Sequence, residues 1–317
     1  MGSPAFAVPS LRALMDAGHD LALIVTRPPH TAGRGRRLTE PDVGIAAHEL
    51  GLSVYQPERI RRPDAVERLQ REHPDAIVIA AYGQILPRAV LDLPPLGCIN
   101  VHPSLLPRHR GPSPIPSAIL AGDPVTGASV MLLDEGMDSG PVLTREQTPI
   151  RPEDDAATLS PALANLGARL LVETLPRWAA GEIQPEPQND AEATYSHLLT
   201  RDDGSLNWHE PAETLWRRVR AVAEWPQAFT HWDGKLLRIL RADFDATGSA
   251  EPGLVVPLGG RAHSPTAAAI GTGAGLLLPR VMGIEGRRPV TIDAFLRGYR
   301  AFIGARLEIP SDIIDAE

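Results

Sequence analysis

The chain has 317 residues, of which 43% are hydrophobic and 22% charged, and its formal net charge is −8. This composition is typical of a globular protein of two domains, and it excludes a surface that is basic throughout. An apolar run of about 18 residues is absent, and so is a basic segment leading into an apolar core at the start. Cys98 is the only cysteine, which rules out a disulfide framework and a multi-cysteine metal site. We therefore expect a cytoplasmic protein without a transmembrane helix or signal peptide.

The first 180 residues alternate between two patterns. Apolar and β-branched runs predict strands at 21–26, 52–57, 75–83, 97–102, 128–134 and 141–150. Helical spacing predicts helices at 8–17, 42–50, 63–73, 114–122 and 155–180. Strands that alternate with helices indicate an α/β fold with a doubly wound, mainly parallel sheet. Such a sheet normally has a central first strand before the first helix. Residues 1–7 enter the first helix directly, so we expect that strand to be missing.

The pattern changes after residue 180. The segment 181–205 is polar and contains two prolines and two glycines, which predicts a linker. Beyond it, a helix at 211–222 precedes short strands at 235–243, 253–257 and 275–279 and a last helix at 291–302. Short strands between Gly and Pro turns indicate a small β-barrel-like domain. The predicted organisation is a catalytic domain at 1–180, a linker at 181–205 and a second domain at 206–317.

Two polar residues end the strand at 97–102. Side chains alternate along a strand, so Asn100 and His102 share one face. The carboxyl ends of strands are where open α/β sheets bind ligands. The later segment DEGMDSGP (134–141) places Asp138 in a glycine-bracketed loop that follows another strand. A carboxamide that stabilises an oxyanion, a protonated histidine and a proton-relaying aspartate together suit acyl transfer between nitrogens.

Each of these residues also has a simpler interpretation. An asparagine or aspartate beside glycines is commonly a turn former, and a single histidine is commonly a core or surface residue. Cys98 is an alternative nucleophile two residues before Asn100, although a lone cysteine in an apolar strand is typically a small buried hydrophobe. His, Asp and Glu do not cluster with the spacing of metal ligands, so we expect no metal.

The motifs INVHPSLLPRHRG (99–111) and DEGMDSGPVL (134–143) resemble the formyltetrahydrofolate-dependent formyltransferases. AGRGRRL (32–38), TYSHLLTRDDGSLNW (194–208) and FLRGYRAFIGARL (295–307) resemble the members that formylate an initiator tRNA, and they extend the resemblance over nearly the whole chain. The resemblance implies a Rossmann-like N-terminal domain and an OB-like, tRNA-binding C-terminal domain. The implied reaction transfers a formyl group from 10-formyltetrahydrofolate to the α-amino group of methionyl initiator tRNA, for translation initiation.

The same resemblance assigns the site residues. The catalytic residues are Asn100, His102 and Asp138. The tetrahydrofolate-binding loop is Ser104, Leu105, Leu106 and Pro107. The loop that reaches the tRNA acceptor stem carries Arg34, Arg36 and Arg37, and arginines between glycines are suited to phosphate contacts. In that family a strand precedes the first helix, so we also expect the natural start to lie upstream of Met1.

Residues 204–307 contain 13 Arg or Lys against 9 Asp or Glu, a modest basic excess that fits a domain facing phosphates. Candidate contacts are Arg217, Arg218, Arg220, Arg287, Arg288, Arg297 and Arg300. Two other functions stay open: a sugar-nucleotide N-formyltransferase that uses the same donor, and a non-catalytic folate- or RNA-binding protein. We expect a monomer that needs no membrane.

Overall fold

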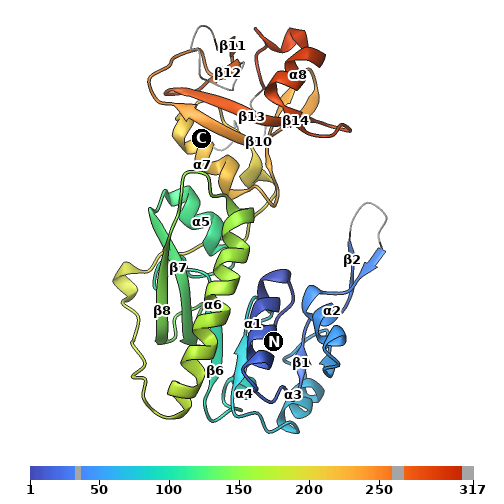
Figure 1. Cartoon of the computed structure of the whole chain (residues 1–317), viewed down its shortest axis with the longest axis vertical. Helices are drawn as coiled ribbons and strands as arrows, with labels where there is room; N and C mark the ends of the chain where they lie inside the picture. Colours follow the sequence, from blue (N-terminus) through green and yellow to red (C-terminus); the bar gives the residue numbers. More distant parts are fainter. Residues whose placement is uncertain (33–36, 259–267, 309–317) are drawn as a thin grey trace. The chain divides into compact units, whose positions relative to one another are not determined.

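The computed structural model describes residues 1–32, 37–258 and 268–308 of the chain (Figure 1). The chain divides into two compact units. The N-terminal unit consists of Met1–Pro114, Pro124–Ile150 and Thr158–His197. The C-terminal unit consists of Ile115–Asp123, Arg151–Ala157 and Leu198–Glu317.

The N-terminal unit is built on two small sheets. One has four strands in the order β5 (Ile77–Ile79), β6 (Cys98–His102), β7 (Val125–Leu132) and β8 (Val142–Pro149). The other pairs β1 (Ile24–Val25) with β4 (Val54–Tyr55). The pairs β1–β4 and β5–β6 are parallel, whereas β7 and β8 are antiparallel to their neighbours. A hairpin of β2 (His30–Ala32) and β3 (Arg37–Thr39) projects from this unit (Figure 1).

Helices cover both faces of these sheets. One face packs against α1 (Val8–Asp16), α2 (Asp42–Glu49) and α6 (Ala156–Ala179). The opposite face packs against α3 (Pro63–Gln70) and α4 (Arg88–Leu91). This arrangement confirms the predicted α/β fold, with helices on both sides of parallel strand pairs.

The alternating side chains of strand β6 contact different parts of the N-terminal unit. All five of its residues are buried, with Ile99 and Val101 in the core under α6 and Cys98 in the core on the other side. Helix α6 comes so close that a Cβ on its Gly167 would lie 2.4 Å from Val101 Cγ1. The apolar half of the strand therefore holds the sheet to α6, and the face that carries Asn100 and His102 is left for other contacts.

The described residues of the C-terminal unit form one antiparallel sheet. Its main path runs β11 (Val255–Pro257), β12 (Ala268–Gly271), β13 (Leu276–Ile284), β10 (Lys235–Asp245) and β9 (Ala228–Trp232), and β14 (Val290–Thr291) pairs with β13. The unit also holds α7 (Ala212–Ala221), α8 (Ile292–Gly298) and most of α5 (Pro114–Ala121). Four short 3-10 helices complete the described structure at Ala5–Ala7, Asp190–Glu192, Asp202–Gly204 and Arg300–Phe302.

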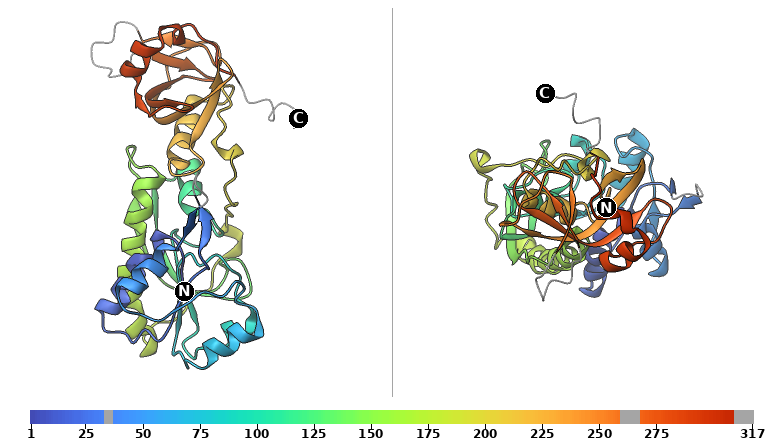
Figure 2. Two further views of the ribbon diagram at one scale, coloured as in Figure 1. Left: turned by 90° about the vertical axis from the view of Figure 1, so that its right-hand side faces the viewer. Right: turned by 90° about the horizontal axis from the view of Figure 1, so that it is seen from above.

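The last described residues close this sheet into a barrel-like shape (Figure 2). The two edge strands of the path are β11 and β9. The segment 305–308 pairs with both, because Arg306 bridges Leu254 beside β11 and Glu308 bridges His231 in β9. The enclosed core includes Trp208, which is fully buried. The predicted barrel-like domain is thus confirmed.

The two N-terminal sheets meet at the first residues of the chain. The Gly2 N–H donates to the Val25 carbonyl at 3.0 Å, and the Ala80 N–H donates to the Met1 carbonyl at 2.9 Å. Met1 and Gly2 therefore bridge β1 and β5 at the position of a central strand. The strands predicted at 21–26 and 75–83 are shortened to β1 and β5. Among the described residues, Met1 and Gly2 alone pair with the sides on which these two strands face each other.

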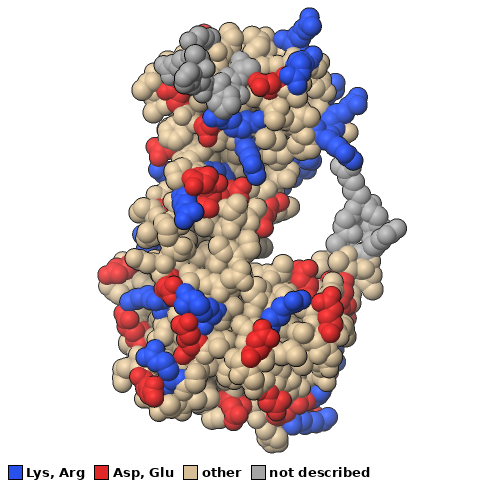
Figure 3. Space-filling model, viewed as in Figure 1, with Lys and Arg blue, Asp and Glu red and all other residues tan. Residues whose placement is uncertain are grey.

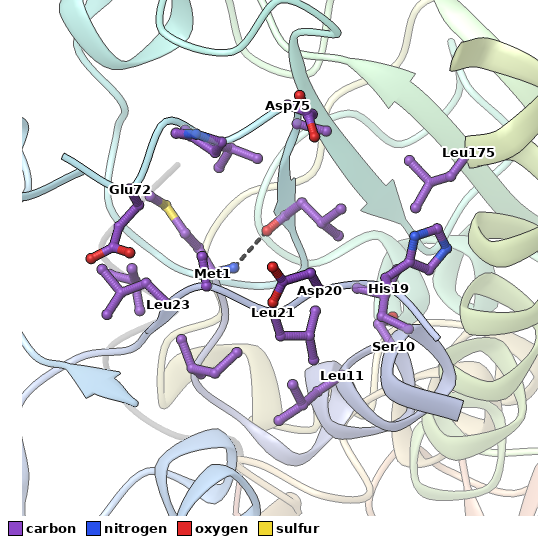
Figure 4. A pocket seen from close by; sticks show the side chains of 18 of the residues that line it. Met1, Ser10, Leu11, His19, Asp20, Leu21, Leu23, Glu72, Asp75 and Leu175 are labelled. Carbon is purple, nitrogen blue, oxygen red and sulfur yellow. Dashed lines mark hydrogen bonds between the residues drawn. The ribbon is translucent and has the colours of Figure 1, made fainter. Parts of the chain in front are cut away.

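A cavity of about 460 Å³ lies beside Met1 and is lined by residues of both β1 and β5 (Figure 4). Its lining is mainly apolar and includes Leu11, Leu21, Leu23 and Leu175. The Met1 amino nitrogen is deeply buried and donates to the Val78 carbonyl at 2.5 Å. Burial lowers the pKa of this amino group from 8.0 to about 5. The fold thus favours an uncharged amine at this point.

Candidate active site

Asn100 and His102 lie at the end of β6, on the face that does not pack against α6. Only 8% of Asn100 and 4% of His102 is exposed. The antiparallel register places Asn100 opposite Met131 and His102 opposite Ser129 of β7. Both side chains are therefore held by a paired strand and not by a loop, which limits how far they can move.

Asp138 reaches these residues from the loop between β7 and β8. Its Oδ1 lies 3.5 Å from Asn100 Nδ2, and its Oδ2 lies 3.6 Å from His102 Nδ1. The Gly111 N–H donates to the same Oδ2 at 2.8 Å. The structure thus brings together the three residues predicted to be catalytic, although Asn100 and Asp138 are far apart in the sequence.

The second ring nitrogen of His102 is already engaged. Nε2 lies 3.0 Å from the carbonyl oxygen of His109, and a carbonyl only accepts, so Nε2 donates its proton there. Nδ1 is then the nitrogen that faces Asp138. A proton on Nδ1 requires the imidazolium form, since Nε2 carries the other proton. In that form His102 holds one N–H donor beside the Asn100 amide and the Asp138 carboxylate.

The predicted folate-binding loop follows His102 in the chain. Two of its residues, Ser104 and Leu106, hold the loop in place. Ser104 and Leu106 are buried, whereas Leu105 and Pro107 are partly exposed. Ser129 Oγ donates to the Ser104 carbonyl at 2.7 Å and accepts from the Leu106 N–H at 3.2 Å. The loop is thus tied to β7 next to His102.

Sequence reasoning missed two residues behind Asp138. Arg110 is 2% exposed, and its guanidinium bonds to the segment 186–197, which lies inside the predicted linker. Gln188 from that segment donates to the carbonyl of Asp138. The basic residues of PRHRG (107–111) are visible in the sequence as a signal in this loop. The partners of Arg110, however, lie about 80 residues later, and no local sequence pattern connects them.

The predicted tRNA contacts are only partly visible. Arg34 and Arg36 lie outside the described residues, and the backbone of Arg37 begins β3, where it pairs with Ala32. In the C-terminal unit, Arg217 pairs with Glu213 on its own helix.

The other basic candidates fall into two groups. Arg218 pairs with Glu210, and Arg220 donates to the carbonyls of Asp154 and Arg151. The remaining candidates are exposed: Arg287, Arg288, Arg297 and Arg300. Figure 3 shows basic side chains gathered over the α8 and β14 side of this unit.

Several other kinds of site have no support among the described residues. Burial raises the pKa of the Cys98 thiol to about 12, so it is a poor nucleophile. Within the described ranges, no three His, Cys, Asp or Glu residues group as metal ligands, and no helix is long and apolar enough to span a membrane. The lining of the cavity beside Met1 does not include Asn100, His102 or Asp138.

Comparison with known proteins gives a consistent result. Residues 1–175 match the family model described as formyl transferase, and residues 198–300 match that of its C-terminal domain. The chain is 46% identical over 302 residues to the methionyl-tRNA formyltransferase of Chloroflexus aurantiacus, covering 95% of this chain and 96% of that protein. It is 44% identical over 308 residues to the methionyl-tRNA formyltransferase of Acidiphilium cryptum, covering 97% and 98%.

A solved structure shares the fold at much lower identity. The N-formyltransferase from Helicobacter canadensis, in complex with folinic acid and dTDP-3-aminofucose, superposes with a TM-score of 0.61 at 15% identity. The similarity covers 88% of this chain and 96% of that one.

The role of Ser129 gives a stability prediction. Ser129→Ala leaves two buried backbone groups of the loop without their partner and should lower the free energy of unfolding by about 1–3 kcal/mol. Thr126→Val on the same strand is the matched control, because the buried Thr126 hydroxyl makes no hydrogen bond with any described residue. Urea unfolding of both variants measures the difference. Equal destabilisation would contradict the assignment.

Proposed function

This chain belongs to the formyl transferase family, and from that premise we propose that it formylates the α-amino group of methionyl initiator tRNA with 10-formyltetrahydrofolate as donor. The observation that carries the proposal is the similarity to methionyl-tRNA formyltransferases over both units of the chain. The fold shared with the N-formyltransferase from Helicobacter canadensis supports the architecture alone. The proposed role is the preparation of the initiator tRNA for translation, in the cytoplasm and as a monomer.

The three residues at the end of β6 would perform the transfer without a covalent enzyme intermediate. The methionyl amine attacks the formyl carbon, a new C–N bond forms, and the carbonyl electron pair moves to oxygen. Asn100 Nδ2 and the Nδ1–H of protonated His102 are the donors for that oxyanion. Collapse of the intermediate breaks the bond from the formyl carbon to N10 of the folate.

Asp138 would move the proton that this exchange requires. The attacking amine must lose a proton, and N10 of the departing folate must gain one. The Asp138 carboxylate lies within 3.6 Å of both oxyanion donors, so a substrate held by them is within its reach. It takes the proton from the amine and returns it to N10. Its negative charge also stabilises the imidazolium of His102.

The loop of Ser104, Leu105, Leu106 and Pro107 would bind the folate. Ser104 and Leu106 anchor the loop internally, so contact with the donor falls to the side chains of Leu105 and Pro107 and to the backbone. The residues predicted for the tRNA are Arg34, Arg36 and Arg37. The exposed arginines of the C-terminal unit are suited to further phosphate contacts.

One prediction from this function concerns Asp138. Asp138→Asn keeps the size of the side chain but removes the proton acceptor, so formylation of methionyl initiator tRNA should fall at least about 100-fold in kcat. The control is Asp134→Asn in the same loop, whose carboxylate bonds to Ser139 and the Gly136 N–H, away from Asn100 and His102. Formyl-methionine released from the tRNA is the measured product.

Two results would count against this function. An unmodified chain that formylates a nucleotide-linked amino sugar but not the tRNA would favour the sugar-modifying activity. Folate binding without turnover on either acceptor would favour a non-catalytic protein.

Another prediction from this function concerns the basic loop of Arg34, Arg36 and Arg37. Replacing Arg34, Arg36 and Arg37 together by alanine should raise the KM for the tRNA and flatten its dependence on salt concentration, because phosphate contacts release counterions. The kcat at saturating tRNA should change less than the KM. Steady-state kinetics at several salt concentrations provide the measurement, with Arg12→Ala, an exposed arginine of α1, as control. An unchanged KM and salt slope would remove the loop from the tRNA interface.

A further inference from the structure

We propose that Arg110 and Gln188 are positioning residues for Asp138, which makes the segment 186–197 a structural part of the active site. This inference rests on the proposed function, because it concerns the same carboxylate. Neither Arg110 nor Gln188 takes part in the proposed transfer of the formyl group.

Arg110 is a buried charge whose partners come from one segment. Its side chain is 2% exposed, although it is a large cation that is costly to bury without partners. Nε donates to Gln188 Oε1 at 3.0 Å, Nη1 to the Tyr195 hydroxyl at 3.1 Å and Nη2 to Asp190 Oδ1 at 2.8 Å. All three partners lie in the segment 186–197, so the guanidinium fixes that segment against the loop that follows β6.

Arg110 also fixes the orientation of the Gln188 amide. A guanidinium only donates, so the atom of Gln188 that faces it must be the oxygen. The amide nitrogen must then point the other way, where it donates to the carbonyls of Asp138 at 2.8 Å and Gly140 at 2.7 Å. Each polar group of the Gln188 side chain is thus used, and one orientation is selected.

Asp138 needs such support, because its backbone is in an unfavourable conformation. Its φ is +50°, in the left-handed region that residues other than glycine seldom adopt. Gln188 holds the carbonyl of this residue from one side. The Gly111 N–H holds its carboxylate from the other side at 2.8 Å.

The two groups that hold Asp138, the Gln188 amide and the Gly111 N–H, are both positioned by Arg110. Gly111 is its neighbour in the chain, and the backbone of Arg110 pairs with the same segment through Thr194 and Ser196. Gly111 has φ +103°, and a Cβ there would lie 2.8 Å from the Ser196 carbonyl oxygen. The segment therefore packs too closely for any other residue at this position. Movement of the segment 186–197 would therefore disturb both the contact of Gln188 with the Asp138 carbonyl and the contact of the Gly111 N–H with the Asp138 carboxylate.

The test is a pair of matched substitutions, Gln188→Glu and Asn189→Asp. Each converts an amide into a carboxylate of the same size and adds the same charge. Asn189 is exposed and bonds to Ala191 and Glu192 within its own turn. Glutamate at 188 keeps a contact with Arg110, but it turns an acceptor toward the carbonyls of Asp138 and Gly140.

We expect Gln188→Glu to lower kcat on the order of 10- to 100-fold through misplacement of the carboxylate, with the KM of either substrate changed by less than about threefold. Asn189→Asp should leave both parameters within about twofold of the unmodified chain. Gln188→Met removes the amide without adding charge and should reproduce the loss. It also carries the test if Gln188→Glu fails to fold. Turnover of Gln188→Met or Gln188→Glu equal to that of Asn189→Asp would overturn the proposal.

A structural measurement separates this proposal from the proposed function. Crystal structures of the unmodified chain and of Gln188→Met should show the Asp138 carboxylate moved out of hydrogen-bond distance from the Gly111 N–H in the variant. An unmoved carboxylate would overturn the positioning role even if the enzyme is active. Conversely, an unmodified chain without activity on methionyl initiator tRNA would remove the proposed function, while the displacement would still report whether Gln188 positions Asp138.

Discussion

The hydrogen bond from the Gly111 N–H to the Asp138 carboxylate joins the parts of the N-terminal unit on which the site depends. It links the loop after β6 to the loop after β7, and it holds the carboxylate 3.5 Å from Asn100 and 3.6 Å from His102. The left-handed φ of Asp138 indicates that this position is imposed by its surroundings and not by local preference. The position of the Asp138 carboxylate therefore depends both on the register of β6 and on the structure of the two loops, and the proposed chemistry depends on that position.

The hydrogen-bonding roles of the two His102 ring nitrogens follow from a contact on the far side of the ring. Because Nε2 donates to the His109 carbonyl, the nitrogen that can serve a substrate is Nδ1, beside Asp138. The two proposed oxyanion donors then belong to residues of one buried strand, whose position is fixed by its register with β7. Rigid placement of donors before the substrate arrives is what makes such stabilisation effective, since little reorganisation remains to be made.

Local patterns predicted most of this architecture. The alternation at 97–102 correctly separated Ile99 and Val101 from Asn100 and His102, because successive side chains of a strand point to opposite faces and the face of Ile99 and Val101 lies in the core under α6. Strands β9, β12 and β14 were missed, since short strands in a curled antiparallel sheet carry little pattern of their own. The contacts of Arg110 with the segment 186–197 join residues about 80 positions apart, and such pairing depends on tertiary structure. The roles of the individual site residues stay predictions.

The single-turnover rate of formyl-methionyl-tRNA formation by Asn100→Asp decides whether the end of β6 carries the chemistry. The substitution keeps the shape of the side chain and replaces the amide donor by a carboxylate that would face the developing oxyanion. With both substrates saturating, the rate should fall on the order of 100- to 1,000-fold relative to the unmodified chain. A rate within about tenfold of the unmodified chain would mean that Asn100 does not stabilise the oxyanion, and that this group of three residues is not the catalytic site.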